Sequence, residues 1–293
     1  MKTTSINIDH HVYFDETYYD LQSFKNLFKK NGIKKVIFSP PCTKYREPEK
    51  SSLMYFIQRR LLMNYFGRML CALISKSFYN NKDELRSFWK LFSGKNSLIK
   101  IIYPDNESLY NKIEHQDNFE MWYWINPNKI KPYEVSSEIN KYSKKIFGLK
   151  FHQYWHSFNL KMIDEYVKIA LINKLPIYLI LSYTNKREIL NIISKYPNVN
   201  FIFGYGGFPL FKSFWKEINK HNNCFIDVAS NHIDKDIIKN IVSKININRI
   251  LFATDCPYNF KNEKDDFDYG LFYNGLSKLT TAEQIKIINN KIK

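Results

Sequence analysis

The chain has 293 residues, 44% apolar and 17% aromatic, which is enough material for one large core. It carries 44 Lys and Arg against 28 Asp and Glu, a formal net charge of +16, but the basic residues are scattered and form no block, which argues against a nucleic-acid partner. The four cysteines are widely spaced, no apolar run could span a bilayer and the amino terminus lacks a signal-peptide pattern, so we expect a cytoplasmic protein with no membrane partner.

Short β-rich runs alternate with longer amphipathic segments along the chain, which is typical of βα units around a parallel sheet. Eight runs are predicted as strands: 5–12, 34–39, 119–125, 147–151, 176–182, 199–203, 224–229 and 249–253. Helical periodicity is clearest over 160–173, 185–195 and 234–244. This pattern predicts a single (β/α)8 TIM-like barrel domain over residues 1–293, with functional residues on the loops that follow the strands.

Residues 40–95 interrupt this rhythm after the second predicted strand. They contain two helical patterns, 53–78 and 82–92, and are followed by a ninth apolar run, 98–103, that has no assigned place among the eight strands. We predict a helical insertion, or lid, over the mouth of the barrel. Its Arg59, Arg60 and Arg68 either face a substrate or lie on an exposed helix face.

Polar side chains gather where four of the predicted strands end. A carboxylate, imidazoles and a lysine that meet at one rim of a barrel are suited to acid–base chemistry. The candidates are His11, Tyr13, Lys150, His152, His156, Tyr205 and Asp255.

Five short motifs occur at these strands and in their order along the chain. They are Ile8-Asp9-His10-His11, Gly148-Leu149-Lys150-Phe151-His152, Pro176-Ile177-Tyr178-Leu179-Ile180, Phe203-Gly204-Tyr205-Gly206-Gly207 and Leu251-Phe252-Ala253-Thr254-Asp255-Cys256-Pro257. Together they resemble the amidohydrolase superfamily, particularly its branch of decarboxylases and lactonases that act on small carboxylic acids. The resemblance implies a barrel with its site at the carboxyl ends of the strands.

The departures from the family pattern concern the metal ligands. Tyr13, Ile180 and Gly204 stand where the family has histidines, so only His11 and Asp255 remain of its metal and catalytic set. A zinc site needs three protein ligands, and isoleucine and glycine side chains offer none. We therefore expect a degenerate metal site and no cofactor.

Two other interpretations remain open. His152 or His156 could rebuild a zinc site with His11 and Asp255, which would make the protein a metal-dependent decarboxylase or hydrolase. Alternatively, the loss of three histidines is typical of a pseudoenzyme retained as a binding or scaffold protein. The insertion at 40–95 would then carry the partner surface.

The favoured hypothesis is a metal-independent hydrolase acting on a small anionic carbonyl compound: a lactone, ester or amide. In this scheme Asp255 is the general base that activates water, and cationic groups stabilise the oxyanion. The small-molecule substrate is the predicted partner, and a homo-oligomer is compatible with the sequence. The assigned catalytic residues are Asp255, His11, Lys150 and His152, and the assigned substrate-binding residues are Tyr13, His156 and Tyr205.

Overall fold

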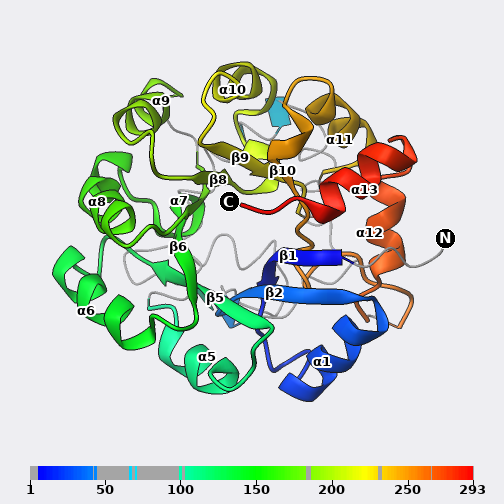
Figure 1. Cartoon of the computed structure of the whole chain (residues 1–293), viewed down its shortest axis with the longest axis horizontal. Coiled ribbons are helices and arrows are strands. Elements are labelled where there is room, and N and C mark those ends of the chain that lie inside the picture. Colours follow the sequence, from blue (N-terminus) through cyan, green and yellow to red (C-terminus); the bar gives the residue numbers. More distant parts are fainter. Residues whose placement is uncertain are drawn as a thin grey trace.

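Eight parallel strands surround a common axis, with helices on the outside (Figure 1). The structure, a computed structural model, describes residues 6–41, 43–44, 66–67, 70, 99–100, 103–182, 186–229, 233–264 and 266–292. The strands, in their order around the sheet, are β1 (Ile6–Tyr13), β2 (Ile33–Ser39), β5 (Phe119–Ile125), β6 (Ile146–His152), β7 (Ile177–Ile180), β8 (Phe201–Phe203), β9 (Cys224–Asp227) and β10 (Ile250–Leu251). All eight match the predicted runs, and the predicted (β/α)8 barrel is confirmed.

The barrel closes through the chain that follows β10. A parallel bridge joins Val12 to Cys256, and the Tyr13 N–H donates to the Cys256 carbonyl over 2.7 Å. The Asp255 N–H donates to the His11 carbonyl over 2.8 Å. Closure therefore brings the first and last motifs of the sequence into contact.

Several of the outer helices begin at a capping side chain that the sequence supplies. The Asp20 carboxylate accepts a hydrogen bond from the Ser23 N–H over 2.7 Å, and Asp234 caps its helix in the same way. The predicted helix at 160–173 is a short 3-10 turn, η2 (Leu160–Ile163), followed by an α-helix. The α-helices whose bounds the structure describes are α1 (Leu21–Lys30), α5 (Asn106–Ile113), α6 (Pro132–Tyr142), α7 (Gln153–His156), α8 (Asp164–Ile172), α9 (Lys186–Lys195), α10 (Phe211–Ile218), α11 (Lys235–Val242), α12 (Tyr269–Gly275) and α13 (Thr281–Asn289).

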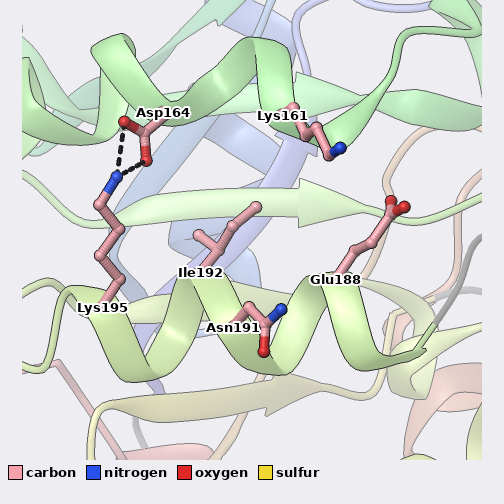
Figure 2. Close-up of a pocket in the computed structure, with 6 residues that line it drawn as sticks. All are labelled: Lys161, Asp164, Glu188, Asn191, Ile192 and Lys195. Carbon is pink, nitrogen blue, oxygen red and sulfur yellow. Dashed lines mark hydrogen bonds and ion pairs between the residues drawn. The ribbon is translucent and has the colours of Figure 1, made fainter.

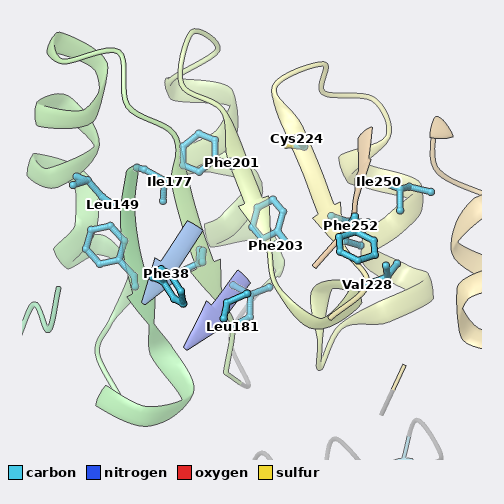
Figure 3. Close-up of a cluster of buried hydrophobic side chains, with 14 of the residues drawn as sticks. Phe38, Leu149, Ile177, Leu181, Phe201, Phe203, Cys224, Val228, Ile250 and Phe252 are labelled. Atoms are coloured by element: carbon cyan, nitrogen blue, oxygen red, sulfur yellow. The ribbon is translucent and has the colours of Figure 1, made fainter. Parts of the chain in front are cut away.

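Two layers of buried side chains hold the barrel. The larger cluster includes apolar side chains from several neighbouring strands, part of which is drawn in Figure 3, and side chains of the surrounding helices. The smaller cluster includes Trp122 and Tyr178, and its remaining buried members are Ile37, Ile180, Ile202 and Leu251. Because both faces of the strands are covered, the strands consist of nearly continuous apolar runs.

The carboxyl-terminal residues cross the end of the barrel at which the strands begin. The Asn290 side-chain amide donates to the Ile250 carbonyl over 2.7 Å, and Ile292 packs against the cluster that contains Trp122 and Tyr178. Figure 1 shows this terminus at the centre of the barrel. That end of the barrel is thus covered by the chain itself.

The predicted ninth run at 98–103 is not a strand of the barrel. Its β4 (Ile99–Lys100) pairs antiparallel with β3 (Thr43–Lys44) in a separate two-stranded sheet. Apart from residues 66, 67 and 70, which are helical, the predicted helices 53–78 and 82–92 lie outside the described residues, as do Arg59, Arg60 and Arg68. Among the helices that are described, none combines the length and the apolar character needed to cross a membrane.

Candidate functional site

Three neighbouring strands present polar or aromatic side chains at the same height in the barrel. Trp124 of β5 pairs in register with Lys150 of β6, which pairs with Tyr178 of β7. Since side chains of paired residues in a parallel sheet share a face, these three lie side by side. Tyr13 and Ser39 form a corresponding pair on β1 and β2.

Lys150 lies at the centre of this layer and is fully buried. Its ammonium Nζ lies 2.8 Å from His11 Nε2, 2.9 Å from Ser39 Oγ and 3.1 Å from Tyr13 Oη. It also lies 4.2 Å from the centre of the Tyr13 ring. An ammonium can only donate, so all three neighbouring atoms accept from it. Sequence analysis assigned Lys150, His11 and Tyr13 to the site, and the structure brings them into direct contact.

The contact with Lys150 fixes the protonation of His11. Because Nε2 accepts from the ammonium, the imidazole proton lies on Nδ1, which is 2.8 Å from Tyr178 Oη. Burial, together with the charge of Lys150, holds the pKa of His11 well below its usual range. His11 is therefore a neutral ring that links the buried lysine to Tyr178.

Asp227, at the end of β9, completes this chain of hydrogen bonds. Tyr178 donates its hydroxyl to Asp227 Oδ2, while Oδ1 accepts from the Tyr205 N–H over 2.7 Å and the Ala229 N–H over 3.2 Å. Burial raises the pKa of the Asp227 carboxyl to about 6 despite these donors. Neither Asp227 nor Tyr178 was among the predicted site residues, although a carboxylate at the end of a barrel strand was an available signal.

Asp255 is the more accessible of the two carboxylates near His11. Its side chain is 8% exposed, whereas that of Asp227 is fully buried. Oδ1 accepts from the Tyr205 hydroxyl over 2.9 Å and lies 3.7 Å from His11 Nδ1, and Oδ2 accepts from the Asn259 amide. Burial is the main cause that raises the pKa of Asp255 to about 7. Asp255 can thus exchange a proton near neutral pH.

The backbone at this rim is held in unusual conformations. Tyr205 and Asp255 have φ angles of 54° and 61°, in the left-handed region that non-glycine residues seldom occupy. Such residues concentrate at functional sites, where the surrounding structure enforces them. The observation supports a functional role for the Tyr205–Asp255 pair.

The two remaining candidates pack around Trp124 rather than against Lys150. The His152 ring stacks on Trp124 at 5.7 Å between centroids, and the His156 ring lies 5.6 Å from it. His152 Nδ1 accepts from the Trp155 N–H over 3.1 Å. Both histidines are buried, and the structure places them on the Trp124 side of the site.

A glycine at the family's strand-six histidine position makes room for Tyr178. A Cβ atom built on Gly204 would lie 2.7 Å from Tyr178 Oη and 3.1 Å from Tyr178 Cε1. The tyrosine thus occupies the space into which a side chain at position 204 would extend. Gly204 was predicted as the position of a lost ligand, and the structure shows that its missing side chain leaves space for the tyrosine on β7.

Gly204→Ala is expected to lower the free energy of unfolding by about 1–3 kcal/mol, because the added methyl overpacks Tyr178. Tyr178→Phe removes the hydroxyl oxygen that lies nearest to the added methyl. The change in unfolding free energy of the double variant should therefore differ from the sum of the two single changes by at least about 0.5 kcal/mol. Urea unfolding of the wild type, the two single variants and the double variant measures this coupling. Strict additivity would show that the two positions are not matched.

The donor set at the centre of the site does not fit a divalent metal ion. Both nitrogens of His11 already take part in hydrogen bonds, and the Lys150 ammonium contacts the two strand-one positions at which the family has histidines. Within the described part of the chain, no three or more His, Cys, Asp or Glu side chains are grouped so as to hold a metal. A zinc ion would need three such ligands.

A groove of about 340 Å³ lies elsewhere, on the outer surface between η2, α8 and α9 (Figure 2). Its clearest polar contact is internal, since Asp164 accepts from Lys195 Nζ over 2.7 and 2.9 Å. This pair joins two helices and is far simpler than the arrangement around Lys150. The other lining residues are Lys161, Glu188, Asn191 and Ile192.

The protein is thus a (β/α)8 barrel with acid–base side chains at the carboxyl ends of its strands. Residues 148–290 match the family model described as Amidohydrolase, so the predicted resemblance to the amidohydrolase superfamily is confirmed over that part of the chain. The matched part contains Lys150, Tyr178, Asp227 and Asp255. No curated protein matches the sequence.

Solved structures share the barrel at low sequence identity. An uncharacterised TIM-barrel protein from Bordetella bronchiseptica is 10% identical, with a TM-score of 0.56 over 92% of this chain and 79% of its own. A zinc-bound amidohydrolase from Burkholderia multivorans is 9% identical, with a TM-score of 0.54 over 97% and 96%. A putative 2-pyrone-4,6-dicarboxylic acid hydrolase from Pseudomonas putida is 9% identical, with a TM-score of 0.51 over 97% and 94%. At these identities, the similarity shows a shared fold and nothing more.

Proposed function

We propose that the protein is a metal-independent hydrolase of a small anionic carbonyl compound, a lactone, ester or amide. The observation that carries the proposal is the fully buried Lys150 ammonium, held by His11, Tyr13 and Ser39 within the same site as Asp255. A cation that the fold keeps out of water attracts negative charge strongly, whether on a substrate carboxylate or on a developing oxyanion.

The proposed reaction begins with the removal of a proton from water. Asp255, oriented by Tyr205 and Asn259, accepts that proton while the water oxygen bonds to the substrate carbonyl carbon. The carbonyl oxygen takes on negative charge, which Lys150 stabilises. The tetrahedral intermediate then collapses, the bond to the leaving group breaks, and Asp255 returns its proton to the leaving oxygen or nitrogen.

The remaining assigned residues position these groups and the substrate. His11 stays neutral and orients Lys150, while His152 helps to hold the substrate carboxylate or carbonyl. Tyr13, Tyr205 and His156 contact the substrate around them. We further propose a cytoplasmic location, which is supported by Cys224 and Cys256, both buried free thiols.

The proposal predicts a pH profile with a single acidic limb and insensitivity to chelators. Asp255 must be ionised to act, and its pKa is raised to about 7, so kcat/KM should fall about tenfold per pH unit below pH 7 and level off above it. The assay uses a panel of carboxylate-bearing lactones, esters and amides, including 2-pyrone-4,6-dicarboxylate, before and after treatment with EDTA.

The outcomes separate the candidate functions. Activity lost with EDTA and restored by zinc would contradict metal independence and support the rearranged metal site. Absence of turnover over the whole panel, together with binding of the same compounds, would support a pseudoenzyme.

A further inference from the structure

The indole N–H of Trp124 is a buried donor that no described residue uses. Trp124 is fully buried, and its Nε1 has no hydrogen-bond partner in the described structure. A buried donor without a partner is destabilising, so native proteins leave few of them, and each requires an explanation.

The other described tryptophans with assigned indole contacts behave differently. Trp122 Nε1 donates to the His10 carbonyl over 2.7 Å, and Trp215 Nε1 donates to the Gly206 carbonyl over 2.7 Å. The fold therefore satisfies indole donors where they serve only packing. Trp124 is an exception within the same barrel.

The Trp124 ring lies among the candidate site residues. Lys150 Nζ lies 4.9 Å from the centre of the Trp124 ring, the Tyr13 ring lies 6.3 Å away, and the His152 ring stacks against it at 5.7 Å. All of these neighbours are candidate site residues. The buried indole N–H thus belongs to a residue that lies beside the buried positive charge of Lys150.

The backbone of Trp124 is also firmly held. The side-chain amide of buried Asn106 makes two hydrogen bonds with this backbone: it accepts from the Trp124 N–H over 2.8 Å and donates to the Trp124 carbonyl over 2.9 Å. Such a double contact fixes the strand at this residue and preorganises the ring for binding.

We infer that Trp124 is a specificity-determining residue whose indole N–H donates to a carboxylate oxygen of the substrate beside Lys150. The inference rests on the proposed function and adds the group that recognises the substrate carboxylate. Together the indole N–H and the positive charge of Lys150 would favour a carboxylate over a neutral group of the same shape, because a hydrogen bond to an anion is stronger and the ammonium attracts a full negative charge.

The test is nuclear magnetic resonance of the indole N–H groups in 15N-labelled protein. Succinate, acetate and phthalate are added in turn at constant ionic strength, and Trp124→Phe identifies the Trp124 signal. We expect a saturable shift of that signal, while the signals of Trp122 and Trp215 move much less because their donors are already occupied.

Calorimetry with the carboxylate that binds gives the energetic test. Trp124→Phe should raise its Kd about tenfold or more, as expected for a hydrogen bond to a charged group. Trp122→Phe is the matched control: it loses an indole N–H that is bonded to the His10 carbonyl, so its Tm should fall and its Kd should change less than about twofold.

The inference is overturned if no carboxylate moves the Trp124 signal more than the Trp122 and Trp215 signals, or if Trp124→Phe binds as the wild type does. Carboxylate binding through Trp124 without any hydrolysis would instead contradict the proposed function and leave this inference in place. Hydrolysis by Trp124→Phe with an unchanged KM would contradict this inference and leave the proposed function in place.

Discussion

Asp255→Asn is expected to lower kcat by about 10²–10⁴-fold, the range that a positioned general base contributes. The amide keeps the shape of the side chain but cannot take a proton from water. The acidic limb near pH 7 should disappear from the residual activity, because the group responsible for it is gone. Steady-state kinetics from pH 5 to pH 9 measure both effects.

Asp9→Asn is the matched control for this experiment. Asp9 is also fully buried, and burial raises its pKa to about 7 as well. Its carboxylate, however, accepts from Thr254 Oγ1 over 2.7 Å, from Tyr269 Oη over 3.1 Å and from the backbone N–H groups of His11 and Thr254. It holds two strand ends together and takes no proton from water in the proposed reaction. Asp9→Asn should keep the acidic limb. Loss of the limb in Asp9→Asn, and its survival in Asp255→Asn, would show that the base is wrongly assigned.

Lys150→Met is expected to lower kcat/KM by about 10²–10³-fold, the loss found when one group that stabilises an oxyanion is removed. The free energy of unfolding should change by less than about 2 kcal/mol, because removing a buried charge offsets the acceptors left without a donor. The pKa of His11 should rise, since the positive charge beside it is lost. Kinetics, urea unfolding and imidazole resonances measure the three effects.

Lys145→Met provides the contrast within the same barrel. Lys145 is buried too, but its Nζ donates to the carbonyls of Gln116 over 2.6 Å and Phe119 over 3.5 Å, where β5 begins. Its loss should destabilise the fold by about 1–3 kcal/mol with little effect on kcat/KM. Equal losses of activity in the two variants would mean that Lys150 acts only through stability.

The barrel could be predicted from the sequence because its signal is repeated eight times. Each strand is a short apolar run, and the turns and helical patterns between them separate one run from the next. The candidate residues His11, Lys150 and Asp255 could also be identified from the sequence, since each is a polar side chain at a point where an apolar run ends.

Tyr178 was missed for a physical reason, whereas Asp227 could have been identified as a carboxylate at the end of a strand. Tyr178 lies inside an apolar run, where a tyrosine is usually a packing residue, and its role depends on the absence of a side chain at Gly204 on the next strand. That match depends on the register between β7 and β8, which pairs Tyr178 with Ile202. Register between strands is set by the assembled barrel and leaves no local mark in the sequence.

The covered end of the barrel limits the routes by which a ligand can reach the candidate site. Ile292 packs against the cluster containing Trp122 and Tyr178, and this cluster fills the barrel interior between Lys150 and that end. In the proposed hydrolase, substrate would therefore bind, and products leave, at the other end of the barrel, where the strands finish. Product release would then have to precede binding of the next substrate, so its rate would limit how fast the reaction can be repeated.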